Sequence, residues 1–179
     1  LDATYGPSWR GSPIGLGVSP VDPDLCYASD YGSAYRTTDG GTNWTQVYAE
    51  NMPAGRVRSR GLNVTGSYGV IFDPFDSGRI ILPTTDVGMF ASSDGGDSWK
   101  HNIAGIPSSW RNTSYWAVFD PDVEGKVWSV WSNCHDLPRE KMFRSGKLEQ
   151  HGYGGGVALS TNSGDSWTMS NAYIPSNTV

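Results

Sequence analysis

The chain has 179 residues and a net charge of −5, and only 17% of its residues are charged. An acidic chain is a poor fit to nucleic acid, whose phosphates need cationic side chains. No apolar run nears the roughly 20 residues that span a bilayer. With 23 glycines, 11 prolines and 8 tryptophans, the composition favours an all-β protein rich in turns. Neither nucleic acid nor membrane is therefore expected as a partner.

Short apolar runs separated by turn residues recur along the chain. Asp-Pro turns divide them at 19–23, 73–76 and 120–122, with an apolar run on either side. The order strand, Asp-Pro turn, strand, loop, strand, turn, strand predicts three repeats of four antiparallel strands. The predicted parts are an incoming strand or arm at 1–11, repeats at 12–50, 66–103 and 114–170, and an exit toward a further repeat at 171–179.

A short stretch that ends in Trp lies near the end of each repeat. It reads TTDGGTNW at 37–44, SSDGGDSW at 92–99 and STNSGDSW at 160–167. Asp-Gly and Gly-Gly between two strand-like runs predict a tight hairpin, because glycine tolerates the positive φ that such turns need. The Asp side chain is expected to accept hydrogen bonds from its own turn, and the Trp ring to fold back over the hairpin.

These stretches resemble the Asp-box, S/T-x-D-x-G-x-x-W, a BNR-repeat motif of sialidase-like and xyloglucanase-type glycoside hydrolases and of sortilin-type propellers. The first two match at every defining position, whereas the third has Asn162 in place of the Asp. The resemblance implies a β-propeller, with each motif at a hairpin on the outer rim of a blade and away from the active site. The expected fold is an all-β propeller segment of about three four-stranded antiparallel blades.

A propeller segment of this size would leave sheet faces uncovered. Propellers close with about four to eight blades, and large exposed apolar surfaces mark interaction sites or lead to aggregation. The chain is therefore expected to lie beside further propeller blades, supplied by the same polypeptide or by another chain.

Strand alternation assigns the loops to the two ends of each sheet. The Asp-Pro turns and the Trp-containing stretches fall at one end, and the loops between second and third strands fall at the other. Asp30, Asp86 and an insertion at 133–154 in the third blade belong to this second end. Binding and catalysis concentrate on loops carried by a rigid scaffold, so this end is the predicted functional mouth.

Carboxylates at this mouth are the candidate catalytic residues. Asp30 lies in SDYGSAYR and Asp86 in TDVGMF. The sequence SDYGSAYR is similar to a T-D-x-G-G-x-Y-R stretch of xyloglucan-specific propeller hydrolases. This resemblance implies a catalytic role for Asp30, and also for Asp86, which occupies the equivalent position in the second repeat. Glycoside hydrolysis needs a pair of carboxylates, and Asp136 in the insertion is a third candidate. The alternative is that these Asp residues cap the bend between two strands.

Other side chains near the mouth are candidates for binding a substrate. Arg56, Arg58 and Arg60 alternate, which places them on one side of an extended segment, and clustered guanidinium groups suit carboxylate or sulfate ligands. The alternative for these arginines is a solvated loop edge. The full set of predicted substrate-binding residues is Arg56, Arg58, Arg60, Arg111, His135, Tyr153 and Trp131.

Two classes of function fit this sequence. The first is a secreted carbohydrate-active propeller, a glycoside hydrolase that acts on a polysaccharide or glycan through a carboxylate pair. The second is a non-catalytic propeller that binds a glycan, a peptide or a partner subunit. No metal or cofactor motif is recognised, so neither is expected, and Cys26 and Cys134 are predicted to be free thiols. The expected location is secreted or extracellular, with the periplasm as the alternative.

Overall fold

A computed structural model describes residues 14–30, 33–60, 66–134 and 154–174 of the chain. It divides into two compact units, 1–65 and 66–179. The described residues contain no α-helix, and their regular structure is β-strand apart from two 3-10 turns at Pro53–Gly55 and Ser108–Trp110. Among the described residues, no helix is long and apolar enough to cross a membrane.

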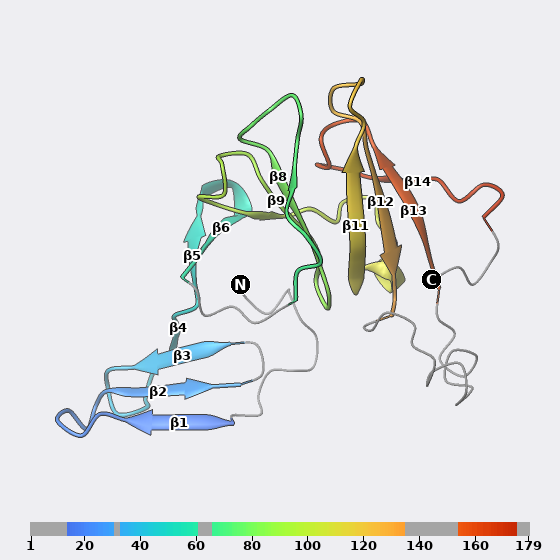
Figure 1. Cartoon of the computed structure of the whole chain (residues 1–179). Helices are drawn as coiled ribbons and strands as arrows, with labels where there is room; N and C mark the ends of the chain where they lie inside the picture. Colours follow the sequence, from blue (N-terminus) through green and yellow to red (C-terminus); the bar gives the residue numbers. More distant parts are fainter. Residues whose placement is uncertain (1–13, 31–32, 61–65, 135–153, 175–179) are drawn as a thin grey trace. The chain divides into compact units, whose positions relative to one another are not determined.

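The first unit holds one four-stranded antiparallel sheet and a separate hairpin (Figure 1). The sheet, which we call repeat 1, has the order β1 (Gly15–Val18), β2 (Cys26–Ser29), β3 (Ala34–Thr37) and β4 (Thr45–Gln46). The hairpin pairs β5 (Ala49–Met52) with β6 (Arg56–Ser59). The sequence predicts no hairpin between the first two repeats, at 12–50 and 66–103, because the two strands of this hairpin are mostly polar.

The second unit contains two further four-stranded repeats, each antiparallel throughout. Repeat 2 consists of β7 (Ile71–Phe72), β8 (Ile80–Thr84), β9 (Gly88–Ser92) and β10 (Lys100–His101). Repeat 3 consists of β11 (Thr113–Phe119), β12 (Val127–Ser132), β13 (Gly155–Ser160) and β14 (Thr168–Met169). One parallel bridge, between Thr113 and Gly88, joins the two repeats. The prediction of an all-β fold built from repeats of four antiparallel strands is confirmed, and these repeats are consistent with a propeller segment.

The hydrophobic core of the second unit lies between repeats 2 and 3. Side chains alternate along β11, where Ala117 and Phe119 are buried while Trp116 and Val118 are exposed. One face of repeat 3 therefore packs against repeat 2, and its other face is largely exposed among the described residues of the second unit. The buried members of the core are Ile81, Met89, Ala91, Ile106, Ala117, Phe119, Val127, Trp131, Ala158 and Trp167.

The three Trp-containing stretches form the turns that the sequence predicts. The side chain of Asp39, Asp94 or Asn162 accepts the main-chain N–H four residues ahead, at 2.9, 2.9 and 3.0 Å. Each turn also bonds to the neighbouring Asp-Pro turn, through Gly40 N to Asp24 O, Gly95 N to Gly78 O, and Ser163 N to Gly125 O. Both kinds of turn thus lie together, as predicted, at what we call the turn end of each sheet.

The Trp rings of these turns have different surroundings. The Trp44 indole N–H donates to a carbonyl of its own turn at 3.1 Å, and the Trp99 ring lies against Gly96 of its own turn. Trp167 is instead part of the core, where its indole N–H donates to Asn102 O of repeat 2 at 3.1 Å. The expectation that each ring covers its own hairpin is incomplete for Trp167, because this position also faces a neighbouring repeat.

We expect the stability of repeat 1 to depend on the ionisation of Asp39. Hydrogen bonds from the main chain and side chain of Asn43 and from the Thr37 hydroxyl hold the pKa of Asp39 at about 2, below its ordinary 3.8. Because the folded pKa is depressed, this stabilisation is present above about pH 4 and is lost as the pH falls toward 2. Urea unfolding across this window should show a steeper loss for the wild type than for Asp39→Asn. Equal pH dependence in the two proteins would contradict this assignment.

Candidate functional site

Loops of repeats 2 and 3 gather at the end of the second unit that lies opposite the turn end. The last strand-paired residues at this end are Thr84–Gly88 between β8 and β9, Gly88–Thr113 between β9 and β11, and Ser132–Gly155 between β12 and β13. The β8–β9 turn, the start of β11 and both ends of the insertion therefore meet there. We call this edge the loop end. It holds Asp86, whereas Asp94 lies at the other end of β9, as strand alternation predicts.

Asp86 lies at the tip of the β8–β9 turn in a strained backbone conformation. The Val87 N–H donates to Thr85 O at 2.8 Å, a bond that spans two residues and defines a γ-turn, and Asp86 has a φ of 67°. A γ-turn with positive φ at its central residue is rare and strained, although Asp tolerates this region better than most residues. Such strain persists only where neighbouring groups enforce it, and it clusters at functional sites.

Gly88, directly after the turn, holds it from one side. Its N–H donates to Asn112 O at 3.1 Å, and its carbonyl accepts the Thr84 hydroxyl at 3.0 Å. Gly88 has a φ of 81°, and an added Cβ would lie 2.9 Å from the Trp131 ring and 3.0 Å from Arg111 O. Only glycine meets both demands, because any side chain would clash with Trp131 and Arg111 and be strained at this φ.

His101, the last residue of β10, holds the turn from the other side. Its Nε2 lies 2.5 Å from Val87 O, and its ring packs on Phe90 with centroids 5.2 Å apart. Burial lowers the pKa of His101 below its ordinary 6.5; the Val87 carbonyl acts in the opposite direction, and the Arg111 charge adds to the lowering. The neutral imidazole has one N–H, and the Val87 carbonyl selects the tautomer that carries it on Nε2. His101 therefore acts as a donor to the Asp86 turn at neutral pH.

Replacing His101 with Phe is expected to loosen this turn, because the ring packing is kept while the donor to Val87 O is lost. Hydrogen exchange at the Val87 and Gly88 amides should accelerate about five- to tenfold, as the loss of one hydrogen bond implies. His101→Gln retains a side-chain N–H and should exchange at close to the wild-type rate. Exchange at Ala91 on the same strand is the internal control, and an unchanged rate at Val87 in the Phe variant would contradict the role of His101.

An aromatic pair lies at the same end of the sheets. Tyr68 and Tyr115 pack edge to face with ring centroids 5.5 Å apart, and the Tyr115 hydroxyl donates to Cys134 O at 3.2 Å. Burial, together with its surroundings at Cys134, raises the pKa of Tyr115, so the hydroxyl remains protonated and keeps this role as a donor. Both rings are half-buried. Partly exposed aromatic rings offer an apolar surface on which a sugar ring can stack.

The structure does not support a substrate-binding role for Trp131. Its side chain is 1% exposed and packs edge to face against Trp167 in the core, with ring centroids 5.9 Å apart. Strand alternation correctly separates Trp131 from the exposed Trp128, but it does not say which of the two faces a neighbouring repeat covers. A buried indole has no free face for a sugar, so this prediction is wrong.

The predicted anion-binding arginines lie in two different units. Arg56 and Arg58 belong to β6 of the first unit, and Arg60 follows directly. Glu50 on β5 pairs with Arg60 at 3.3 Å and with Arg58 at 3.8 Å, so a carboxylate already meets part of this positive charge. Exposed pairs of this kind contribute little to stability. Arg111 lies instead at the loop end of the second unit, where its Nε donates to a main-chain carbonyl at 2.8 Å.

Asp30 occupies in the first unit the place that Asp86 occupies in the second, between the second and third strands of its repeat. It is buried, and its N–H donates to Ser33 O at 3.1 Å. Cys26 and Cys134 are buried and form no disulfide, as predicted. Within the described ranges, no three His, Cys, Asp or Glu side chains are close enough to hold a metal ion. The predicted site residues His135, Asp136 and Tyr153 lie outside the described residues.

Comparison with known proteins finds no family model that matches the chain. An oligoxyloglucan-reducing end-specific xyloglucanase of Emericella nidulans is 25% identical over 161 residues, which cover 85% of this chain and 17% of that protein. The chain therefore spans only a small part of the curated relative's length.

Similar solved structures are more distant in sequence. An ancestral GH74 enzyme is 16% identical with a TM-score of 0.47, over 93% of this chain and 21% of that one. A GH74 xyloglucanase from Xanthomonas campestris is 15% identical with a TM-score of 0.41, over 90% and 24%. YCF48 bound to D1 peptide is 15% identical with a TM-score of 0.35, over 98% and 57%.

Proposed function

We propose that this chain is part of a secreted glycoside hydrolase that acts on a polysaccharide, and that its loop end contributes to the active site. The observation that carries the proposal is Asp86, a carboxylate on a strained turn that Gly88 and His101 hold in place. Strain of this kind is retained where a side chain must be presented in one orientation. The similarity to a xyloglucanase supports xyloglucan as the class of substrate.

Hydrolysis of a glycosidic bond requires two carboxyl groups with separate tasks. One protonates the leaving oxygen as its bond to the sugar carbon breaks, and the other takes a proton from the attacking water or attacks the sugar carbon itself. Asp86 is proposed as one of the two, and Asp30 and Asp136 remain proposed catalytic residues. A carboxyl separation of about 5–5.5 Å would lead to retention of stereochemistry, and one of about 6.5–9.5 Å to inversion.

Substrate binding is assigned to side chains around the loop end. Tyr68 and Tyr115 provide a stacking surface, and Arg111 supplies hydrogen-bond donors for sugar hydroxyls. His135 and Tyr153 of the insertion remain proposed contributors. The Trp-containing stretches, which resemble Asp-boxes, are proposed to take no part in the chemistry, because they lie at the turn end of the sheets.

A propeller that binds a glycan without cleaving it is the second candidate function. Asp86 is the single carboxylate among the described residues of the second unit's loop end, which are 66–70, 84–88, 107–115, 132–134 and 154–155. The aromatic pair, by contrast, needs no acid to hold a sugar. A loop end with one carboxylate and a stacking surface is suited to binding unless a second acid is supplied from elsewhere.

Incubating the natural polypeptide that contains this chain with xyloglucan, and counting newly formed reducing ends, tests the proposal. We expect reducing ends to accumulate with time and in proportion to the protein added. Retardation of the protein in a xyloglucan-containing native gel, without new reducing ends, would show binding without cleavage. That result would overturn hydrolysis in favour of the second candidate function. Neither retardation nor release of reducing ends would overturn both candidates.

A further inference from the structure

Repeats 2 and 3 correspond to one another around their Asp-Pro turns. In repeat 2 the Asp73 N–H donates to Arg79 O at 3.1 Å, and in repeat 3 the Asp120 N–H donates to Lys126 O at 2.9 Å. The same spacing separates the two residues of each pair, so Lys126 takes the place of Arg79. The corresponding pairs along the strands that follow are Ile81 and Trp128, and Pro83 and Val130.

The face of repeat 2 that carries Ile81 is covered by repeat 3. Ile81 and Pro83 are fully buried, and Ile81 shares the core with Ala117 and Phe119 of β11. An added Cβ on Gly164 of repeat 3 would lie only 3.0 Å from the Ile81 side chain. This contact shows how one repeat of the chain is covered by the next.

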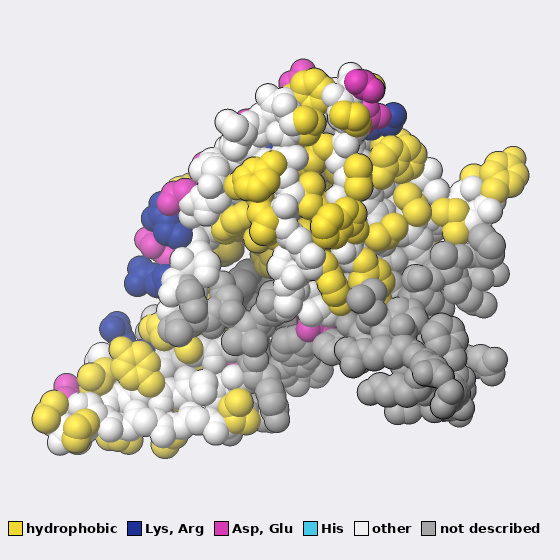
Figure 2. All heavy atoms as spheres, in the orientation of Figure 1, with side chains coloured by type: hydrophobic (Ala, Val, Ile, Leu, Met, Phe, Trp, Pro, Cys, Tyr) yellow, Lys and Arg dark blue, Asp and Glu magenta, His cyan; other side chains and the backbone are white. Residues whose placement is uncertain are grey.

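The corresponding face of repeat 3 is largely exposed among the described residues of the second unit, where Gly69 of repeat 2 lies against one edge of it, at the Trp116 ring. Trp128 and Val130 of β12 are 38% and 37% exposed, and their cross-strand partners Val118 and Trp116 of β11 are 51% and 47% exposed. Figure 2 shows hydrophobic side chains gathered over the region where Figure 1 places β11 and β12. A contiguous apolar surface of this kind, on strands whose other face is fully packed, marks an interaction site.

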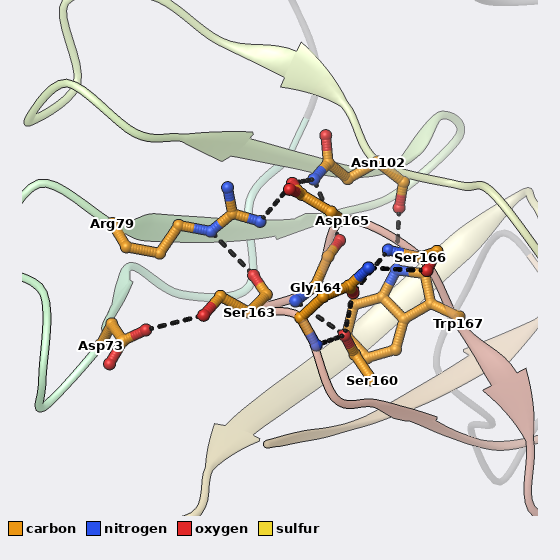
Figure 3. A network of polar contacts seen from close by, with 10 residues as sticks. Asp73, Arg79, Asn102, Ser160, Ser163, Gly164, Asp165, Ser166 and Trp167 are labelled. Carbon is orange, nitrogen blue, oxygen red and sulfur yellow. Dashed lines mark hydrogen bonds and ion pairs between the residues drawn. The ribbon is translucent and has the colours of Figure 1, made fainter. Parts of the chain in front are cut away.

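A polar network completes the contact between repeats 2 and 3 (Figure 3). Arg79 donates from Nε to Ser163 O at 2.7 Å and from Nη2 to Asp165 Oδ1 at 2.8 Å. Asn102 Nδ2 donates to Gly164 O at 2.9 Å and to the same Asp165 oxygen at 3.1 Å. All of these acceptors belong to the Trp-containing turn of repeat 3. A basic side chain of one repeat thus pairs with an acidic turn of the next.

Lys126 places a positive charge at the corresponding position on this exposed face. Its Nζ lies 2.8 Å from Asp120 Oδ2 and 6.0 Å from the centre of the Trp128 ring. An ammonium group has three N–H donors, so pairing with Asp120 does not exhaust its capacity for acceptors. The exposed face of repeat 3 therefore combines an apolar surface with a cation at its edge, as the covered face of repeat 2 does.

We propose that this face, formed by Trp116, Val118, Trp128, Val130 and Lys126, receives a further four-stranded repeat from the same polypeptide. That repeat brings an acidic residue, at the position of Asp165 in its own turn, into an ion pair with Lys126. A second copy of this chain that docked through its first repeat would bring the uncharged Thr42 to that position. The proposal does not depend on glycan hydrolysis.

Covalent labelling of surface side chains, read by mass spectrometry, tests the proposal on two proteins. One is the 179-residue chain, and the other is the natural polypeptide extended to the end of the next repeat. Acetylation of Lys126 and oxidation of Trp128 should fall at least about tenfold in the longer protein, because a packed interface excludes the reagents. Lys100, exposed on β10, should be labelled equally in both and serves as the control.

Two variants of the longer protein separate the ion pair from simple burial. Lys126→Glu should restore most of the Trp128 oxidation, because two carboxylates would then face one another, whereas Lys126→Arg should keep Trp128 protected. Equal labelling of Trp128 in the short and long proteins would overturn the proposal. Protection that instead rises with the concentration of the 179-residue chain would assign the face to a second copy and would also overturn it.

Discussion

Replacing Asp86 with Asn is expected to lower kcat/KM on xyloglucan by about 10²–10⁴-fold, the range that follows from loss of a positioned acid or base. Asn has nearly the same shape as Asp and tolerates the same left-handed backbone conformation, so the turn should remain intact. The substitution thus removes the proton transfer or nucleophilic attack and little else. The measurement is the rate of reducing-end release at several xyloglucan concentrations.

The matched control for this substitution is Asp94→Asn, at the opposite end of β9. Repeat 3 shows that the amide is accepted in this turn, since Asn162 Oδ1 accepts the Ser166 N–H at 3.0 Å and Asn162 Nδ2 lies 2.9 Å from the Ser166 hydroxyl. The kcat/KM of the Asp94→Asn protein should therefore remain within about twofold of the wild-type value. An Asp86→Asn protein with undiminished activity would exclude Asp86 from the chemistry.

Gly105→Ala is expected to lower the free energy of unfolding by about 3–5 kcal/mol, since backbone strain and overpacking act together. Gly105 lies in the connection between β10 and β11 with a φ of 87°, and an added Cβ would come within 1.9 Å of the Trp167 carbonyl oxygen. The two backbones are tied together, because the Trp167 N–H donates to Ala104 O at 2.8 Å. A methyl group here would force repeats 2 and 3 apart.

Gly95→Ala isolates the contribution of backbone conformation alone. Gly95 has a φ of 71°, but no atom lies within 4 Å of an added Cβ. In repeat 3 the equivalent residue, Ser163, adopts a φ of 55°. We expect a cost of about 1–2 kcal/mol from the left-handed conformation. Urea unfolding of both variants measures the difference, and equal costs would show that the contact between Gly105 and Trp167 does not limit the packing of the two repeats.

The parts of the fold that depend on local sequence could be predicted well. The Asp-Gly-Gly turn needs only its own glycines and the carboxylate of Asp39 or Asp94, so four-stranded antiparallel repeats follow from the spacing of such turns. The separation of Asp86 from Asp94 follows from strand alternation, which holds whatever the sheets pack against. The absence of a disulfide between Cys26 and Cys134 was also predicted, because they belong to the first and third predicted repeats and a disulfide needs close Cα atoms.

The parts that depend on contacts between repeats could not be predicted. Alternation places Trp128 and Trp131 on opposite faces, but the burial of Trp131 is decided by repeat 2. Asn102 and His101 belong to no motif, and their roles arise from partners that lie 62 and 14 residues away along the chain. A polar residue at the end of an outer strand or directly after it is a weak sequence signal, since most such residues are solvated.

The claim that the loop end binds a glycan is tested most directly by NMR, with a xyloglucan oligosaccharide titrated into the isotopically labelled protein. We expect the amide resonances of Val87, Arg111 and Asn133 to shift in proportion to saturation. The resonances of the Trp-containing turns of repeats 2 and 3 should stay in place, because these turns lie at the opposite end of their sheets. Shifts confined to those turns, or no shifts at millimolar oligosaccharide, would contradict the account.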